Sequence, residues 1–147
     1  MAFAMLTIAE VMVARLRANV AAVDDASIRY SHRILVAHDD SPAIYVIPQK
    51  WSEGEGKNCQ RRVATLVVAV LVRADDGLAV AGPIIEAVAA ALDPSTSIPA
   101  APYPNGVRVK LGPGWVNEAG ADTDACRVDI DYEAAFDTNG EHSLAVA

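Results

Sequence analysis

Three carboxylates recur at every second position near the end of the chain: Asp129, Asp131 and Glu133. In an extended strand, alternate residues point to the same side and lie about 6.6 Å apart, so these three would share one face. Such a row could hold a metal ion for nucleic-acid cleavage. General acid and base catalysis needs two carboxyl groups in different environments, and these three share one. The pattern therefore favours a solvated or intersubunit acidic face.

A glycine-containing segment, Gly54-Glu-Gly-Lys57, has the outline of a phosphate-binding loop. A Walker motif requires glycine where this chain has Trp51, and Ser or Thr where it has Asn58. The carboxylates of Glu53 and Glu55 would also repel a phosphate group. We therefore predict no nucleotide site in this segment.

Histidine and cysteine offer equally weak signals. His32 and His38, with the acidic pair Asp39-Asp40, form the one His and carboxylate group that could bind a metal ion. In a continuous strand the two histidines would lie about 20 Å apart, too far for one ion. Cys59 and Cys126 lack the spacing of a zinc site or a disulfide framework, which predicts reduced thiols. The sequence thus favours a protein that is not an enzyme and has no catalytic residue, cofactor or metal site.

Charge is unevenly spread along the chain, whose formal net charge is -7. Residues 117–147 contain eight acidic side chains and one basic side chain, Arg127. Residues 50–73 instead carry a local excess of +3. Tight binding to duplex nucleic acid needs a basic face, and the chain as a whole does not provide one.

The longest apolar run, Val63–Val72, decides the fold. It has about half of the roughly 20 residues that a membrane-spanning helix needs, and its β-branched residues favour a strand. Both faces of this strand are apolar in the middle, so both must be covered. We expect helices on one face and a second sheet or a neighbouring subunit on the other. The start of the chain lacks the pattern of a secretory signal, so we expect a soluble cytoplasmic protein with no membrane partner.

Hydrophobic spacing and turn residues predict the remaining elements. The first is a helix over Thr7–Val23 with a capping box at Thr7, followed by strands Ile28–Val36 and Ala43–Ile47, which form a hairpin that ends at Pro48. A regular helix then runs from about Ala81 to Leu92. The last two elements are a short strand Val107–Leu111, closed by Gly112-Pro-Gly114, and a long strand Ala125–Asp137. Residues 49–60 and 93–106 are expected to be loops, and residues 138–147 a frayed tail beyond a core of about 6–137.

These elements predict a single α+β domain over residues 1–147. Its sheet is expected to be mostly antiparallel, with one long central strand, and packed by two helices. The predicted order is helix-strand-strand-strand-helix-strand-strand.

This order of elements resembles the tail terminator, or tail-tube capping, proteins of long-tailed bacteriophages, also called minor tail or tail completion proteins. The likeness covers Leu6 to Asp137 and includes a last strand of the type Val128-Asp-Ile-Asp-Tyr132 that leads to Phe136. The resemblance implies a non-enzymatic ring, usually a homo-hexamer, in the virion tail. Such a ring sits on the end of the tail tube, stops its growth and contacts the head connector protein. DNA passes through its lumen without specific binding, and assembly takes place in the cytoplasm of the bacterial host.

The charge pattern suggests which residues such a ring would use. The candidate intersubunit or partner contacts are Lys50, Trp51, Lys57, Arg61, Arg62, Arg73, Asp129, Asp131 and Glu133. The basic and acidic segments could pair between adjacent subunits, and an acidic lumen would let DNA slide. Trp51 either contacts the tube or the connector, or folds back onto its own domain.

Two other functions remain open from the sequence. One is another neck or head-tail adaptor component of the same assembly. The other is a small ligand-binding or enzymatic domain, which a monomer with a closed, polar-lined pocket would favour.

Overall fold

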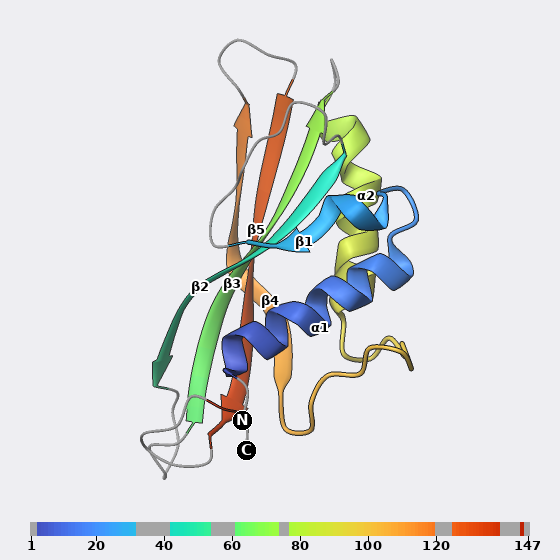
Figure 1. Cartoon of the computed structure of the whole chain (residues 1–147). Helices are drawn as coiled ribbons and strands as arrows, with labels where there is room; N and C mark the ends of the chain where they lie inside the picture. Colours follow the sequence, from blue (N-terminus) through green and yellow to red (C-terminus); the bar gives the residue numbers. More distant parts are fainter. Residues whose placement is uncertain are drawn as a thin grey trace.

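The computed structural model describes residues 3–31, 42–53, 61–73, 77–119, 125–138 and 145. Its elements are α1 (Ala4–Asn19), a 3-10 turn η1 (Asp25–Ser27), β1 (Ile28–Tyr30), β2 (Ala43–Glu53), β3 (Arg61–Arg73), α2 (Gly77–Leu92), β4 (Arg108–Ala119) and β5 (Ala125–Asp137). Figure 1 shows the strands as one twisted sheet beside two helices. The predicted α+β fold and the predicted order of helices and strands are confirmed.

The five strands form one sheet in the order β1-β2-β3-β5-β4, so β3 is the central strand. β3 pairs antiparallel with β2 on one side and with β5 on the other. The apolar run Val63–Val72 lies entirely within it. The long central strand expected from that run is therefore confirmed. Among the described residues, no helix is long and apolar enough to cross a membrane.

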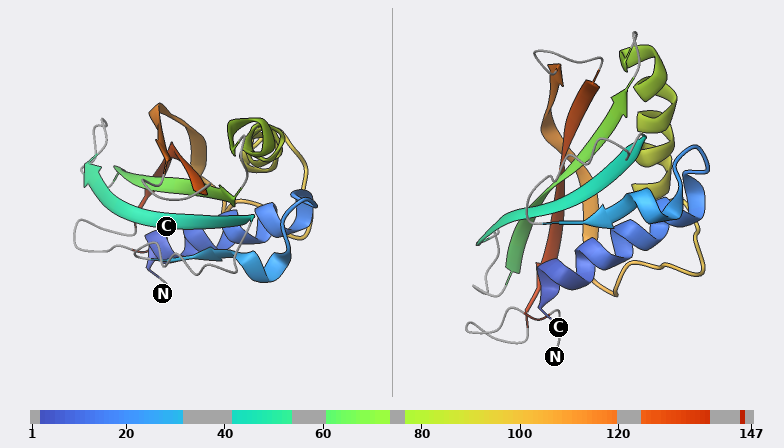
Figure 2. Two further views of the ribbon diagram at one scale, coloured as in Figure 1. Left: turned by 90° about the horizontal axis from the view of Figure 1, so that it is seen from above. Right: turned by 45° about the horizontal axis from the view of Figure 1, so that its top comes forward.

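Both helices pack on the same face of the sheet. Figure 2 shows α2 running alongside the long strands, while α1 lies across them. The side chains of β3 that face the helices are all buried: Ala64, Leu66, Val68, Val70 and Val72. They share one core with the apolar sides of α1, α2 and β5, because alternate residues of a strand point to the same face.

The opposite face of β3 is also covered. Tyr45, Ile47, Val67 and Ala69 form a second buried cluster there. The guanidinium of Arg29 lies 5.3 Å from the centre of the Tyr45 ring and donates a hydrogen bond to its hydroxyl. The expectation that neither face is bare is confirmed at the middle of the strand, but no second sheet forms among the described residues.

The predicted hairpin between the first two strands is wrong. β1 runs parallel to β2, with Ile28 opposite Ile44 and Tyr30 opposite Val46. A two-residue turn can join only antiparallel strands, whereas the connection between Tyr30 and Ala43 has the dozen residues that a parallel crossover requires. The predicted strand continued to Val36, but residues 32–36 lie outside the described part of the chain.

β2 does not end at Pro48 as predicted but continues to Glu53. Its register against β3 shifts between Pro48 and Lys50. Proline has no amide hydrogen to donate, and a bulge at a strand edge accommodates that loss. Residues 49–53 of the predicted loop are therefore strand, and residues 54–60 lie outside the described residues.

β4 also continues past its predicted end at Leu111. Its register against β5 shifts between Leu111 and Trp115, so Gly112-Pro-Gly114 forms an irregularity within the strand instead of closing it. A Cβ atom on Gly112 would lie 2.9 Å from the carbonyl oxygen of Asp131. Glycine therefore lets the two strands approach closely enough to stay paired through this irregularity.

α1 begins at Ala4, so the predicted capping box at Thr7 does not form. Phe3 takes the N-cap position, and the Thr7 hydroxyl inside the helix donates to the carbonyl of Phe3 at 3.2 Å. Ala4 and Met5 of the extra turn are buried in the core, which outweighs the capping preference of Thr7. The helix ends at Asn19, ahead of the predicted end at Val23.

α2 begins at Gly77, earlier than the predicted start near Ala81. Pro83 consequently lies inside the helix instead of in its first turn. Its ring is exposed to solvent while Ala81 and Ile84 beside it are buried, so packing of the apolar face sustains the helix through a position that lacks an amide donor.

The described residues of the predicted frayed tail are not frayed. Thr138 is 1% exposed, and Ala145 forms a bridge with Phe3 at the start of the chain. Pairing between the two ends of the chain thus buries positions that the sequence alone marks as terminal and small.

Candidate functional site

The acidic row of β5 lies on the face of the sheet away from the helices, beside cations of the same chain. Arg127 donates two hydrogen bonds of 2.7 Å to the carboxylate of Asp129. Lys110 of β4 forms an ion pair of 3.4 Å with Glu133. Asp131, between them, forms no ion pair with the described residues. Two of the three predicted carboxylates are therefore partly neutralised within the chain, and Asp131 is the acid left for other contacts.

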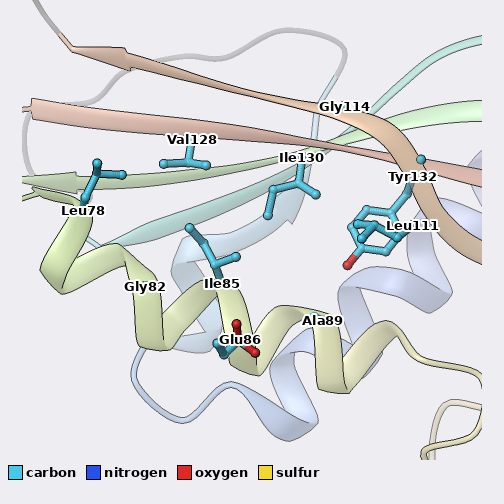
Figure 3. A pocket seen from close by; sticks show the side chains of 11 residues that line it. Leu78, Gly82, Ile85, Glu86, Ala89, Leu111, Gly114, Val128, Ile130 and Tyr132 are labelled. Atoms are coloured by element: carbon cyan, nitrogen blue, oxygen red, sulfur yellow. The ribbon is translucent and has the colours of Figure 1, made fainter.

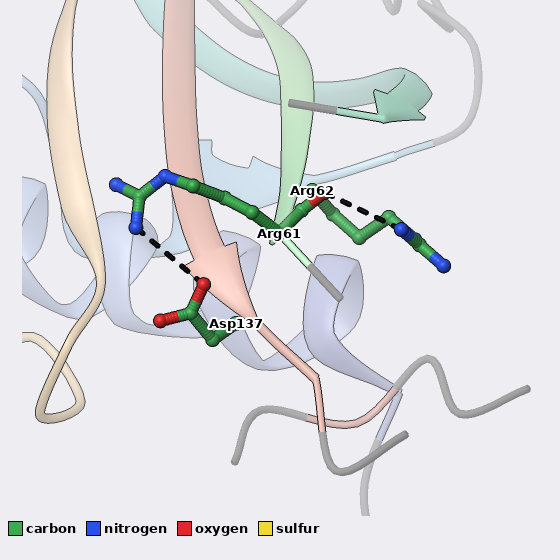
Figure 4. Close-up of polar contacts among 3 residues, drawn as sticks. All are labelled: Arg61, Arg62 and Asp137. Carbon is green, nitrogen blue, oxygen red and sulfur yellow. Dashed lines mark hydrogen bonds and ion pairs between the residues drawn. The ribbon is translucent and has the colours of Figure 1, made fainter. Parts of the chain in front are cut away.

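The two arginines that begin β3 point to opposite faces of the sheet, as Figure 4 shows. The guanidinium of Arg61 lies 3.4 Å from the carboxylate of Asp137 at the end of β5. Arg62 is only 3% exposed, donates to the carbonyl of Arg61 at 3.3 Å, and lies 5.4 Å from the centre of the Trp51 ring. Arg61 thus already pairs with the acidic segment of its own chain.

The predicted contact residues of the basic segment do not form one patch. Four of them gather at one end of the sheet: Lys50, Trp51, Arg61 and Arg62. Arg73 lies at the other end of β3, about 40 Å away by strand rise. Lys57 lies outside the described residues. Trp51 is 39% exposed, so one side of its ring packs within its own domain and the other faces solvent.

Arg15 of α1 is a buried charge that the sequence analysis did not place in the core, at 2% exposure. Its guanidinium donates hydrogen bonds of 2.8 to 3.0 Å to the carbonyl oxygens of Ala91, Asp93, Thr96 and Ala101. It also lies 4.4 Å from the centre of the Tyr103 ring, whose hydroxyl donates to the carbonyl of Leu92. The signal was present, because Arg15 follows Ile8 by seven residues and Met12 by three, on the apolar stripe of the helix.

The surroundings of Arg15 perturb nearby ionisable groups. Burial raises the pKa of Tyr103 far above its usual range, against a smaller opposing effect of the Arg15 charge. Burial, followed by the negative charge of Asp93, raises the pKa of Tyr132 to about 12. Hydrogen bonds from the amide and the hydroxyl of Ser95 lower the pKa of the Asp93 carboxyl. The tyrosines are therefore neutral and the aspartate is ionised at neutral pH.

A groove of about 510 Å³ separates α2 from the β4–β5 edge of the sheet, and we call it the α2 groove. Figure 3 shows its lining, which includes Leu78, Ile85, Leu111, Val128, Ile130 and Tyr132. Leu78 is 49% exposed and Leu111 is 61% exposed, which is unusual for large apolar side chains that lie around one hollow. Among the described residues that line the groove, Glu86 is the one ionised side chain. No pattern in the sequence predicted this groove.

The described residues contain no group of three His, Cys, Asp or Glu side chains that could hold a metal ion. The weak candidates noted in the sequence, which are the 54–57 segment, His32, His38, the pair Asp39-Asp40 and Cys59, lie outside those residues. Cys126 is partly buried and forms no disulfide with the described residues. The features that the described structure offers are thus surfaces and a groove.

Comparison with solved structures finds a similar fold in a chain described as part of the virion of a native gene transfer agent particle. The TM-score is 0.62 at 20% sequence identity, and the match covers 88% of this chain and 92% of that one. Comparisons with protein-family models and with curated proteins find no match. At this identity, the likeness establishes a common fold.

Proposed function

We propose that the chain is a structural subunit of a phage-like virion, in which it forms a ring on the end of the tail tube, ends tube polymerisation and joins the tail to the head connector. The observation that carries this proposal is the fold shared with the gene transfer agent virion chain. Because the match spans most of both chains, the likeness extends beyond one common supersecondary motif. The resemblance of the element order to tail terminator proteins then supplies the position in the tail.

The charges of the chain agree with a ring that DNA crosses without binding. The formal net charge of -7 opposes contact with phosphate groups. We place the contacts with neighbouring subunits, the tube or the connector at the sheet end that carries Lys50, Trp51, Arg61 and Arg62, and at Asp131 on β5. Arg73 and Lys57 remain candidate contacts at other positions.

The first test is the mass of the purified protein in solution. Mass photometry, with negative-stain electron microscopy of the same sample, should show a closed ring of several copies, and a homo-hexamer is expected. A protein that stays monomeric across the range of concentrations would contradict the proposed ring and favour a ligand-binding or enzymatic domain.

The second test separates a tail terminator from another neck component. A purified tail tube protein is polymerised with and without the ring, and tube lengths are measured by electron microscopy. A terminator should shorten the tubes and appear as a cap on one end. Unchanged tubes, with binding of the ring to a purified connector protein, would instead identify a head-tail adaptor.

A further inference from the structure

The α2 groove has the properties of a binding surface that the described residues leave open. Leu78 and Leu111 stand exposed at its rim, and Ile85 and Ile130 line its interior. Contiguous exposed apolar side chains around a hollow mark interaction sites in soluble proteins. Glu86 forms no ion pair with the described part of the chain and places one negative charge beside this apolar surface. The groove therefore suits an apolar group with a cation next to it.

The chain carries an exposed lysine and an exposed tryptophan, adjacent in sequence, at the end of β2. Lys50 and Trp51 are both exposed, and we call residues 50–52 the β2 tip. β1 pairs only with Ile44 to Val46, so the tip lies at the outer edge of the described sheet. The guanidinium of Arg62 over the Trp51 ring fixes the ring's orientation. Tryptophan is among the side chains that are enriched at the energetic centres of interfaces.

The β2 tip and the α2 groove lie on opposite sides of the molecule, so they cannot meet within one chain. In both Figure 1 and Figure 2, the end of β2 points away from α2. Two different and complementary surfaces on opposite sides generate a head-to-tail contact, which closes into a ring when the rotation between copies allows it.

We propose that the α2 groove binds the β2 tip of a second copy of this chain, with Trp51 among the apolar side chains and the Lys50 ammonium paired with Glu86. Lys50 lies opposite Thr65 and Trp51 lies opposite Ala64, so the two side chains leave the strand on opposite faces. The flexible lysine stem turns round the exposed strand edge to reach the carboxylate at the rim. This inference rests on the proposed ring and names the contact that would build it.

Filling the groove provides the first test. A Cβ atom on Gly82, in the wall of the groove, would meet no atom within 4 Å, so a side chain has room to start there, and that of Gly82→Leu extends into the groove. Replacing a helical glycine also favours the helix, which guards against unfolding. Gly82→Leu should shift the assembly to monomers in size-exclusion chromatography with light scattering, whereas the matched control Gly82→Ala should assemble like the wild type. Circular dichroism checks that both variants are folded.

Charge exchange provides the second test. Lys50→Glu and Glu86→Lys should each weaken assembly at least tenfold in the dissociation constant, because each places like charges opposite one another. The double variant Lys50→Glu/Glu86→Lys restores opposite charges and should recover most of the affinity. Recovery would not occur if the two residues acted at separate sites.

The outcomes separate this inference from the proposed function. If the wild type forms a ring and folded Gly82→Leu forms the same ring with the same affinity, the groove is not the contact and the inference is overturned, while the proposed ring stands. A ring that is weakened by both single charge variants without recovery in the double variant would likewise overturn the pairing. A monomeric wild type would overturn the proposed ring itself.

Discussion

Among the described residues, two arginines are almost fully buried, and their surroundings differ. Arg15, on α1, bonds four backbone carbonyl oxygens that lie 76 to 86 residues further along the chain. Arg62, at the start of β3, bonds the carbonyl of the preceding residue and covers the ring of Trp51 on the neighbouring strand. One arginine therefore joins distant parts of the chain, and the other shapes one end of the sheet.

This difference separates a residue that specifies the fold from one that shapes a surface. The carbonyls around Arg15 include those at the C-terminal end of α2, where the helix dipole favours a positive charge. All three guanidinium nitrogens donate to these carbonyls, which fixes the segment after α2 against α1. Around Arg62, the packed partner is a half-exposed tryptophan. We expect loss of Arg15 to affect folding, and loss of Arg62 to affect mainly the end of the sheet.

Replacement of Arg15 should have the largest effect. Arg15→Ala leaves buried carbonyl groups without their donor and should lower the free energy of unfolding by at least about 3 kcal/mol. Arg15→Lys keeps the charge but not the planar set of donors, so it should recover only part of the loss. Urea denaturation followed by circular dichroism measures both. A loss below about 1 kcal/mol for Arg15→Ala would show that the four bonds do not hold the fold together.

Replacement of Arg62 should have a smaller effect, confined to the end of the sheet. Arg62→Ala removes the cation above the Trp51 ring and should cost about 1 to 2 kcal/mol in the free energy of unfolding. Trp51 should become more exposed, and its fluorescence should shift to longer wavelength. Spectra of the same variant in a Trp51→Phe background give the signal of Trp115, which is subtracted to isolate that of Trp51. A loss as large as that of Arg15→Ala would remove the distinction between the two arginines.

The sequence was most informative where local pattern and tertiary pairing agree. The alternation in residues 125–137 gave the bounds of β5 as the structure has them. Pro48 and Gly112-Pro-Gly114 were read as ends because both disfavour regular pairing, yet both strands continue through a shift of register. Pairing with a long neighbouring strand outweighed the local preference, and no feature of one segment alone reveals its neighbour.

The candidate sites were less predictable for a related reason. The row Asp129, Asp131 and Glu133 was correctly placed on one face, but its neutralising partner Lys110 comes from another strand, which only the register identifies. The α2 groove forms between elements that pack together in three dimensions and has no sequence motif. Arg15 did carry a signal in its spacing, but arginine is rarely buried, and we did not predict it in the core.

Alkaline pH should distinguish the dry region around Arg15 from the surface. The pKa of Tyr132 is raised from 10.0 to about 12 in the fold, so between these values the unfolded chain loses its proton while the folded chain keeps it. The contribution of Tyr132 to the free energy of unfolding is therefore fully present below pH 10, and it is lost as the pH rises towards 12. Tyr132→Phe should show a shallower decline in the free energy of unfolding across this interval. Tyr30→Phe, at an exposed tyrosine, is the control, and equal slopes in both variants would contradict the assignment to Tyr132.

The exposed pair between Arg61 and Asp137 should have the smallest effect. Arg61 lies next to Arg62 in the chain but on the other face of the sheet, and both members of its ion pair are at least a third exposed. Solvent and salt screen such pairs, so a double-mutant cycle with Arg61→Ala and Asp137→Ala should give a coupling energy below about 1 kcal/mol. The coupling should decrease further in 0.5 M salt, about the concentration at which the screening length falls below 5 Å. A larger coupling energy that resists salt would mean that this face is shielded from water. Burial would then not distinguish Arg61 from Arg15 and Arg62, and the difference between them would lie in their bonding partners.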